Sequence, residues 1–265
     1  ADTVETAATV DLDNEWREIV IPQDFQMPEG GLHIRLGDIW REEDSRLQLY
    51  KGFAAQAFAR ANRIDRVIWD SPRPRLGIVS AGKAYADTLQ ALEELGIDET
   101  VAAEIGIRLY KVGMPWPLEP HGIRQFCEGL EEVLVIEEKR EFLEHQIKWQ
   151  LYNWDEKVRP RVVGKYDENG QWLLHPDNEL TLGEIAHVIA SRIARFHTTD
   201  RIRAKLEMFA ARAAAKRSYA APIARKPYFC SGCPHNTSTK VPENSRALAG
   251  IGCHIMALWM DRNTE

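Results

Sequence analysis

The chain has 265 residues, of which 44% are hydrophobic and 28% are charged, and its formal net charge is −6. This balance predicts a globular protein with one large domain or two ordinary ones, and it argues against a disordered chain. The longest apolar runs, such as residues 130–136, are interrupted by glutamates and are far shorter than the roughly 20 residues that cross a bilayer, so a membrane protein is not expected.

The first part of the chain predicts irregular structure followed by one helix. Residues 15–40 place turn formers such as Pro22 and Pro28 between short apolar runs. Residues 47–62 are rich in Ala and Phe and repeat apolar side chains at helical spacing. The sequence opens on Ala1 rather than Met, so we expect it to be a piece of a longer protein with two artificial ends.

Strand-like and helix-like segments alternate from residue 76 onward. Strands that alternate with helices build a parallel sheet that is covered by helices on both faces. The sequence therefore predicts an α/β domain at residues 75–165. Its predicted strands are residues 76–79, 107–112 and 132–136, and its predicted helices are residues 84–95, 121–130 and 142–152.

The following segment is predicted to be a hairpin and a helical connector. Asp167-Glu-Asn-Gly170 is typical of a tight turn, which indicates a hairpin within residues 165–178. Residues 182–196 and 201–216 have helical spacing. Residues 220–222 (Ala-Ala-Pro) and Pro227 then indicate a linker into the last part of the chain.

Charge is unevenly distributed along the sequence. Residues 1–50 carry twelve Asp or Glu against four Lys or Arg, whereas residues 192–226 carry ten Lys or Arg against two acids. The basic stretch could attract a phosphate-bearing ligand or an acidic protein, but a solvated helix face is the ordinary interpretation. Nucleic-acid binding is disfavoured because the whole chain is acidic and has no basic motif rich in aromatic residues.

Two loops that follow predicted strands carry polar side chains. Residues 80–83 (Ser-Ala-Gly-Lys) lie where a strand passes into a helix, and backbone N–H groups can bind an anion there. Their spacing matches neither glycine-rich nucleotide motif, so a tight structural turn is favoured. Glu137 and Glu138 follow the third strand, where a carboxylate can orient a ligand or simply complement a helix N-terminus.

Other conspicuous residues have ordinary explanations. Three prolines within residues 115–120 predict an extended loop, and its Trp116 is expected to be a packing anchor or an interface residue. Cys127 is interpreted as a buried, small apolar residue. Isolated histidines are expected to be surface or structurally satisfied residues, and these are His33, His121, His145, His175, His187 and His197.

The three remaining cysteines form the strongest chemical signal. Cys230-Ser-Gly-Cys233-Pro-His235 is followed by Gly250-Ile-Gly-Cys253-His254, and two thiols three residues apart can bind one ion. Zinc would be satisfied by the three thiols and either histidine, whereas a [4Fe-4S] cluster would need a fourth cysteine from beyond residue 265. The four cysteines of the chain do not form the even, dispersed pattern of an extracellular disulfide framework, and the sequence shows no signal peptide. A cytoplasmic location is therefore expected.

Several ordered motifs together resemble the thiamine-diphosphate-dependent 2-oxoacid:ferredoxin oxidoreductases, and in particular the long fused indolepyruvate ferredoxin oxidoreductases. The resemblance runs nearly from end to end. The motifs on which the resemblance rests are ADTVETAATVD at residues 1–11, LGIVSAGKAY at 76–85, RLYKVGMPWPLEP at 108–120, VLVIEEK at 133–139, FCSGCPH at 229–235 and GIGC at 250–253.

This resemblance implies a domain order. Residues 1–70 would be the tail of a pyrimidine-binding thiamine domain plus a linker, and residues 75–165 a transketolase C-terminal-like parallel sheet flanked by helices. Residues 166–225 would be the hairpin and helical connector. Residues 226–265 would start the thiamine-diphosphate-binding domain, with Cys230, Cys233 and Cys253 as three ligands of a [4Fe-4S] cluster.

The resemblance also implies a reaction for the parent enzyme. Thiamine diphosphate with Mg²⁺ would decarboxylate an aryl 2-oxoacid, the acyl group would pass to coenzyme A, and iron–sulfur clusters would carry electrons to ferredoxin. The family's activating glutamate and its magnesium-diphosphate motif are expected before Ala1 and after Glu265. We therefore expect the isolated chain to be inactive, and the parent to be a homo-oligomer. The alternative is a non-catalytic α/β scaffold with a structural zinc site.

Overall fold

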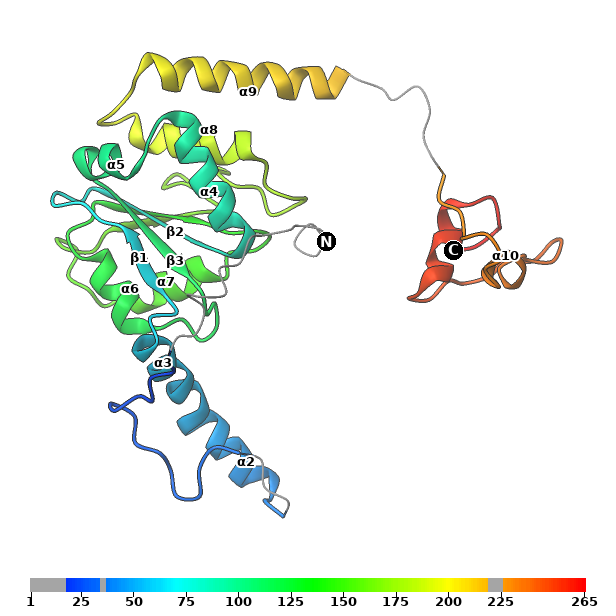
Figure 1. The fold of residues 1–265 in the computed structure, drawn as a ribbon, viewed down its shortest axis with the longest axis horizontal. Coiled ribbons are helices and arrows are strands. Elements are labelled where there is room, and N and C mark those ends of the chain that lie inside the picture. Colours follow the sequence, from blue (N-terminus) through cyan, green and yellow to red (C-terminus); the bar gives the residue numbers. More distant parts are fainter. Residues whose placement is uncertain (1–17, 34–36, 219–225) are drawn as a thin grey trace. The chain divides into compact units, whose positions relative to one another are not determined.

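The computed structural model describes residues 18–33, 37–218 and 226–265. These residues fall into two compact units, Ala1–Ala211 and Arg212–Glu265, and both are drawn in Figure 1. The motif at residues 1–11 and the predicted linker at residues 220–222 lie outside the described residues.

The first unit contains the sheet and most of the helices. A helical arm precedes the sheet and consists of three consecutive segments, α2 (Trp40–Arg46), η1 (Leu47–Lys51) and α3 (Gly52–Ala61). The strands are β1 (Arg66–Trp69), β2 (Leu76–Ala81), β3 (Ile107–Val112), β4 (Glu132–Ile136) and β5 (Arg161–Val163). The later helices are α4 (Gly82–Leu95), α5 (Glu99–Ile105), α6 (Pro120–Cys127), α7 (Leu143–Leu151), α8 (Leu182–Ile193) and α9 (Asp200–Ser218), whose last residues belong to the second unit.

The strand order is β1-β3-β2-β4-β5. Strand β2 is parallel to both of its neighbours, β3 and β4, and β5 is parallel to β4. The α/β prediction is therefore confirmed. The sheet is nevertheless mixed, because β1 runs antiparallel to β3. Only residues 70–75 separate β1 from β2, and a parallel crossover needs a dozen or more residues, so the chain reverses direction between them.

Each face of the sheet has its own apolar core. Leu76 and Ile78 of β2 pack into one cluster with residues of α4 and α8, whereas Val79 packs into a second cluster with residues of α6 and α7. This division follows from the alternation of side chains along a strand. Figure 1 shows α4 and α8 on one side of the sheet and α6 and α7 on the other. The predicted coverage of both faces is thus present.

A glycine on the central strand lets the second layer approach closely. A Cβ atom on Gly77 would lie 2.5 Å from Cδ1 of Leu130 and 2.8 Å from Cε1 of Phe126. Both residues belong to the core cluster on the α6 side. The sheet and this layer can therefore pack at their observed separation only because residue 77 has no side chain.

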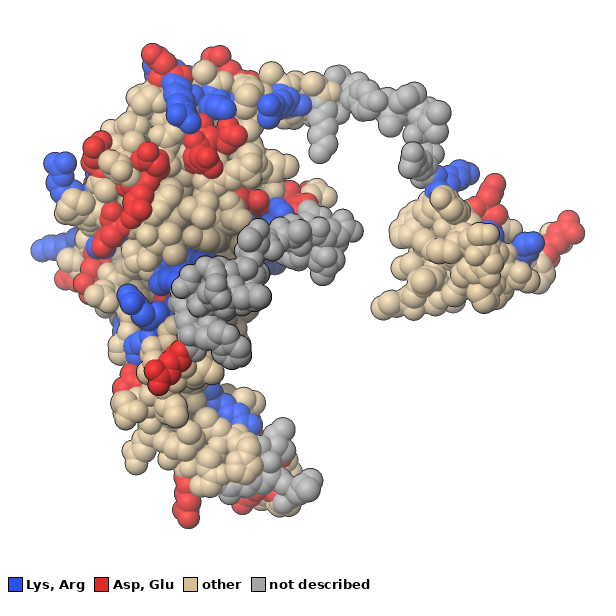
Figure 2. All heavy atoms as spheres, viewed as in Figure 1, with Lys and Arg blue, Asp and Glu red and all other residues tan. Residues whose placement is uncertain are grey.

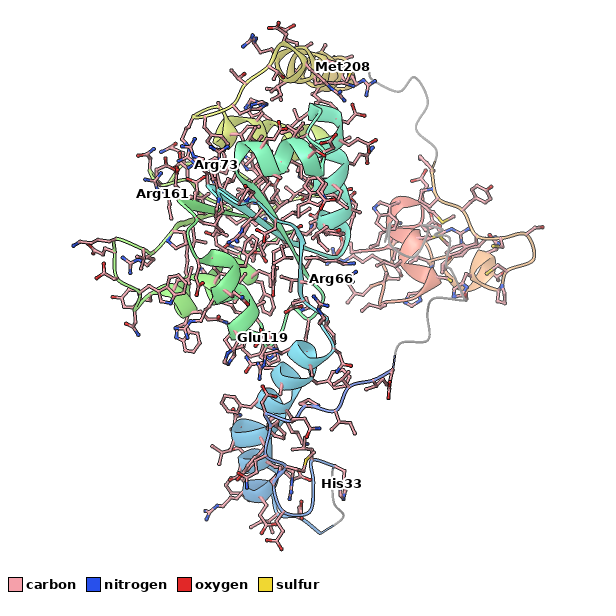
Figure 3. The ribbon with its side chains drawn as sticks, turned by 60° about the vertical axis from the view of Figure 1, so that its left-hand side comes forward. His33, Arg66, Arg73, Glu119, Arg161 and Met208 are labelled. Atoms are coloured by element: carbon pink, nitrogen blue, oxygen red, sulfur yellow. The ribbon has the colours of Figure 1, made fainter. Side chains whose placement is uncertain are left out.

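Arg60 links the helical arm to the sheet domain. Arg60 of α3 pairs with Asp24 at 2.5 Å and with Glu119 at 2.5 Å. Glu119 also accepts hydrogen bonds from the backbone N–H groups of His121 and Gly122 at the start of α6. Figure 3 places Glu119 near the junction of the arm with the sheet domain. One guanidinium thus joins the loop before the arm, the arm itself and α6.

The described part of the connector after the sheet contains a hairpin bridge and the helices α8 and α9. Tyr166 and Trp172 form an antiparallel bridge around the predicted turn, so the hairpin is present. In the basic stretch, Lys205 pairs with Glu94 and Arg203 pairs with Asp200. Figure 2 shows acidic side chains interspersed with basic ones on the visible face of the first unit. Within the described residues, no helix is long and apolar enough to span a bilayer.

The second unit is small and has little core. Its short elements beyond α9 are α10 (His235–Ser238) and the 3₁₀ helix η2 (Cys253–Trp259). Phe229 and Ala257 are its buried apolar residues among those that the structure describes. Backbone hydrogen bonds between residue 247 and residues 263 and 265 bring its last residues back along an earlier loop.

Candidate functional site

Cys230 and Cys233 lie on a tight bend. The N–H group of Cys233 donates to the carbonyl oxygen of Cys230 at 3.0 Å, and Gly232 between them has φ of +76°. The Asn236 side chain also donates to the Cys230 carbonyl, at 3.0 Å. The Cys230 side chain is exposed and that of Cys233 is partly buried. A glycine allows this left-handed conformation, which keeps both thiols on a short turn.

Cys253 lies on a second bend, at the start of η2. Gly252 before it has φ of +141°, and the thiol is exposed. The backbone N–H of Gly250 donates to Nε2 of His254 at 3.0 Å. Because a backbone N–H can only donate, this nitrogen carries no proton, and a neutral His254 is protonated on Nδ1.

Stacked planar side chains connect the two bends. The His235 ring stacks on the His254 ring, with centroids 6.2 Å apart and planes inclined by 16°. The His235 ring also stacks with the Phe229 ring, with centroids 5.4 Å apart. The Arg262 guanidinium lies over the Phe229 ring, 5.5 Å from its centroid. We call Arg262, Phe229, His235 and His254 the aromatic column.

One member of the column contacts a cysteine directly. Nδ1 of His235 lies 3.2 Å from Sγ of Cys233. The four cysteines of the chain, all within the described residues, form no disulfide. Among residues 18–33, 37–218 and 226–265, no group of three or more His, Cys, Asp or Glu side chains is close enough to hold a metal ion. The centre at Cys230, Cys233 and Cys253 therefore stays a prediction.

The chemistry of the donor set fits an iron–sulfur or soft-metal centre. Thiolates are the ligands that such centres prefer, and all three sulfurs lie in one small unit on bends opened by glycine. Cys127 differs in every respect, because it is fully buried in the sheet domain and burial raises the pKa of its thiol to about 12. Because the described thiols are not gathered closely enough to hold a metal ion, a ligand at the three cysteines would require their sulfurs to move closer together.

A cavity of about 470 Å³ lies beside the column. His235 and His254 form part of its wall, together with the basic residues Lys240 and Arg246. Arg246 pairs with Glu265 at 2.8 Å across an exposed surface. The two histidines that follow the cysteine bends thus line one cavity, whose lining combines imidazole, cationic and apolar groups.

The loop at residues 80–83 behaves as the structural turn that was favoured. Gly82 has φ of +55° at the start of α4. Lys83 pairs with Asp87 at 2.6 Å and with Glu179 at 2.9 Å; burial acts to lower its pKa, but these two acids raise it above its ordinary value. Acidic groups at this helix N-terminus oppose the binding of an anion. Ser80 is fully buried, and its hydroxyl has no hydrogen-bond partner among the described residues.

The Glu137 side chain caps the start of α7. Its carboxylate accepts hydrogen bonds from the backbone N–H groups of Leu143 at 2.8 Å and Glu144 at 3.0 Å, at the start of α7. Burial raises the pKa of this carboxyl group. The backbone carbonyl oxygen of Glu137 accepts a hydrogen bond from Nζ of Lys165 at 2.5 Å, and burial lowers the pKa of that lysine. These contacts agree with the interpretation that the Glu137 carboxylate complements a helix N-terminus.

Trp116 is exposed rather than packed as a core anchor. Its side chain is 68% exposed, and its ring lies 6.1 Å from that of Phe142. Gln146 of α7 fixes the loop, because it donates to the carbonyl oxygen of Pro115 and accepts from the N–H of Leu118. An apolar groove of about 650 Å³ between this loop and the helical arm includes Trp116 in its lining.

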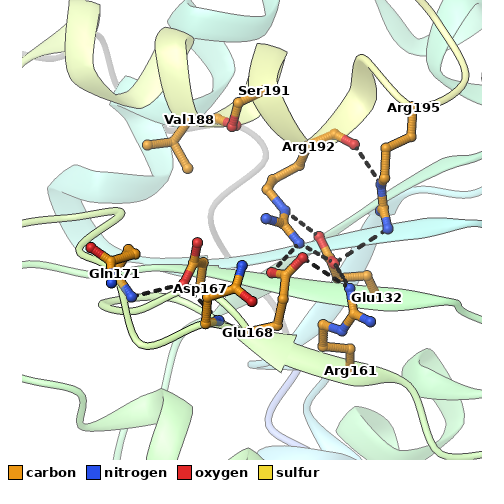
Figure 4. Close-up of polar contacts among 10 residues, drawn as sticks. Glu132, Arg161, Asp167, Glu168, Gln171, Val188, Ser191, Arg192 and Arg195 are labelled. Carbon is orange, nitrogen blue, oxygen red and sulfur yellow. Dashed lines mark hydrogen bonds and ion pairs between the residues drawn. The ribbon is translucent and has the colours of Figure 1, made fainter.

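The sequence reasoning missed one buried polar network. Glu132 at the start of β4 is fully buried and pairs with Arg192 of α8 at 2.5 Å. Arg195 at 3.5 Å and Arg161 at 3.6 Å face the same carboxylate, and Glu168 joins through Arg192 at 2.9 Å, as Figure 4 shows. The glutamate at the start of an otherwise apolar strand was the available signal, but its partners are 29 or more residues away in sequence.

The chain belongs to the indolepyruvate ferredoxin oxidoreductase family. A family model described as the indolepyruvate ferredoxin oxidoreductase middle domain matches residues 65–221, which is more than half of the chain. The matched range begins just before β1 and ends beyond α9, so it contains the whole sheet and the helices that cover it. The resemblance inferred from the sequence motifs is thereby confirmed.

Curated relatives carry the same family name. The indolepyruvate oxidoreductase subunit IorA of Pyrococcus abyssi is 25% identical over 195 residues, which are 69% of this chain and 26% of the relative. The IorA subunit of Pyrococcus horikoshii is 34% identical over 92 residues, which are 34% of this chain and 13% of the relative. The chain thus spans about a quarter or less of the length of these relatives.

Similarity to solved structures is weaker. A split-gene transketolase, described as an inactive beta4 tetramer, has a TM-score of 0.35 at 16% identity, and the match covers 50% of this chain and 42% of that one. The 2-oxoglutarate:ferredoxin oxidoreductase from Magnetococcus marinus, with 2-oxoglutarate, coenzyme A and succinyl-CoA bound, has a TM-score of 0.32 at 15% identity, over 57% of this chain and 21% of that one. The fold assignment therefore rests on the strand order and the helices described above.

Proposed function

We propose that this chain is a segment of an oxidoreductase that converts an aryl 2-oxoacid, such as indolepyruvate, to its acyl-CoA and passes the electrons to ferredoxin. The family match over residues 65–221 carries the proposal, and the names of the curated relatives support it. The parent would use thiamine diphosphate with Mg²⁺, act in the cytoplasm and assemble as a homo-oligomer.

Within that enzyme, we assign the sheet domain and the second unit different tasks. Residues 75–165 would be the transketolase C-terminal-like domain, between the pyrimidine-binding tail at residues 1–70 and the connector at residues 166–225. Residues 226–265 would begin the diphosphate-binding domain. The difference between the buried Cys127 and the cysteines of the second unit, of which Cys230 and Cys253 are exposed and Cys233 is partly buried, supports this division.

Cys230, Cys233 and Cys253 would hold a [4Fe-4S] cluster together with a fourth ligand. Such a cluster, when bound, accepts and releases one electron at a time. The chain's own contribution is to present three sulfurs on glycine bends, with the His235 imidazole beside the Cys233 sulfur. The thiols must lose their protons before they can bind, because the thiolate is the ligating form.

Anaerobic reconstitution of the full chain with Fe²⁺ and sulfide tests this assignment. The wild-type chain should take up iron and sulfide and turn brown, and Cys230→Ala should abolish both. Cys127→Ala is the matched control, because its thiol is buried in the other unit and should not affect uptake. Uptake that survives Cys230→Ala and Cys253→Ala alike contradicts the assignment.

A structural zinc site is the second candidate. The imidazole of His235 beside Cys233 favours it, since cysteine and histidine together are common zinc ligands. A colourless chain that retains stoichiometric zinc, and that loses it on Cys230→Ala, supports the scaffold alternative. The isolated chain, supplied with thiamine diphosphate, Mg²⁺, a 2-oxoacid, coenzyme A and a redox dye, should show no turnover in either case.

A further inference from the structure

One ring of the aromatic column contacts a cysteine of the candidate centre, and the other two rings belong to sequence neighbours of the remaining cysteines. Phe229 precedes Cys230 in the chain, His235 contacts the sulfur of Cys233, and His254 follows Cys253. The rings of these three residues stack in succession, at 5.4 Å and 6.2 Å. The spacing between the two cysteine bends is therefore coupled to the orientation of the His235 ring, which is the middle member.

Arg262, at the end of the column, is hydrogen-bonded to residues of and just after α10, the short helix that begins at His235. Arg262 donates to the carbonyl oxygen of Asn236 at 3.0 Å and to the hydroxyl of Thr239 at 2.7 Å, while its guanidinium faces Phe229. Phe229 is itself buried, with 4% of its surface exposed. The His235 ring thus stacks with the buried Phe229 ring and with His254, whose Nε2 accepts a hydrogen bond from the Gly250 N–H.

The chemistry of the contact fixes its direction once sulfur is a ligand. A metal-bound thiolate has no proton and can only accept a hydrogen bond. The nitrogen that lies 3.2 Å from Cys233 is Nδ1 of His235, so this nitrogen must then carry the proton. Hydrogen bonds to charged sulfur are stronger than neutral ones, and hydrogen bonds to cluster sulfurs are one of the means by which proteins set reduction potentials.

We infer that His235 is a positioning residue that donates its Nδ1–H to the Cys233 sulfur of a bound iron–sulfur cluster and raises the reduction potential of that cluster. The inference rests on the cluster assignment proposed above. Reduction adds negative charge, so a donor at the ligand sulfur stabilises the reduced state more than the oxidised one. His254 and Phe229 keep the donor pointed at the sulfur through the stack.

The test compares variants of the full chain reconstituted with Fe²⁺, sulfide and a small thiol. His235→Ala removes the donor, and His235→Asn keeps an N–H near the position of Nδ1. His145→Ala is the control, because this histidine lies in the other unit and is 68% exposed. Iron and sulfide content, the midpoint potential and the spectrum of the reduced cluster are measured for each.

We expect His235→Ala to retain its iron and sulfide but to become about tenfold harder to reduce, a fall of about 59 mV for a one-electron couple. His235→Asn should return most of that shift, and His145→Ala should match the wild type. A cluster in His235→Ala with the wild-type potential and spectrum overturns the inference and leaves the cluster assignment intact.

Two further outcomes are also decisive. A wild-type chain that takes up neither iron nor sulfide overturns the cluster assignment itself, and the inference with it. If His235→Ala loses the cluster altogether, His235→Asn decides: a cluster near the wild-type potential supports the donor role, whereas loss of the cluster there too overturns it.

Discussion

Arg192 donates two hydrogen bonds to the Glu132 carboxylate, from Nε to Oε1 at 2.7 Å and from Nη2 to Oε2 at 2.5 Å. The two residues are 60 positions apart, and both are buried, with 8% and 0% of their surface exposed. The pair joins the first residue of β4 to α8. A buried ion pair of this kind is costly to break from one side, because the remaining charge loses its partner without regaining water.

Glu132→Gln should therefore destabilise the sheet domain by about 3–5 kcal/mol. Urea unfolding of the full chain, followed by far-ultraviolet circular dichroism, measures this change. Glu131→Gln is the matched control one residue away, since its pair with Arg75 at 2.8 Å is exposed to water and is screened. Similar losses for the two variants would contradict the assigned importance of burial.

Glu137 should give the stability a pH dependence. Burial raises its folded pKa above the ordinary value of 4.5, so its stabilising contribution is complete below that value and is lost as the pH rises through the folded pKa. Between about pH 4 and about pH 7, the wild type should lose stability relative to Glu137→Gln. Urea midpoints of both proteins across this range test the sign. A difference that is constant or runs in the opposite direction rules the explanation out.

Two glycine substitutions should have opposite effects. Gly77→Ala places a methyl group 2.5 Å from Leu130 and should cost about 1–3 kcal/mol through overpacking. Gly52 lies inside the continuous helical arm with φ of −62° and has open space around it, so Gly52→Ala should gain about 0.5–1 kcal/mol. Thermal or urea unfolding of both variants provides the measurement, and equal signs would refute the packing argument at residue 77.

The cysteines should differ in reactivity. With a pKa of about 12, the buried thiol of Cys127 is almost fully protonated at about pH 8, so iodoacetamide should modify it only after unfolding. Cys230 and Cys253 are exposed and should react in the native, metal-free chain. Peptide mass spectrometry reads the sites. Reconstitution with iron and sulfide should protect Cys230, Cys233 and Cys253, whereas continued labelling of all three would argue against a shared centre.

Long periodic elements could be predicted from the sequence, and short ones could not. The strands β2, β3 and β4 and the helices that follow them have enough residues to display a period. Strand β1 has four residues and β5 has three, which is too few for a recognisable alternation. Helix α5 was also missed, although Asp98 before it caps the N–H of Val101 at 2.9 Å and was a usable signal.

The candidate site was predictable in composition but not in arrangement. The spacing of Cys230, Cys233 and Cys253 identified the sulfur-bearing segment, because two thiols three residues apart are a local pattern. The contact between His235 and His254 spans 19 residues and depends on how two bends pack, so no local pattern reveals it. Long-range ion pairs such as Glu132–Arg192 were hidden for the same reason.

The two outermost strands of the sheet have features that discourage pairing with a second molecule. Each is very short, and each begins with an arginine, Arg66 on β1 and Arg161 on β5, both labelled in Figure 3. The register of β1 also shifts between Val67 and Trp69, which interrupts its regular hydrogen-bonding rim. Short, charged or bulged borders offer a poor template for intermolecular β-pairing. The buried, strongly apolar strand β2 is thereby shielded from aggregation on both sides.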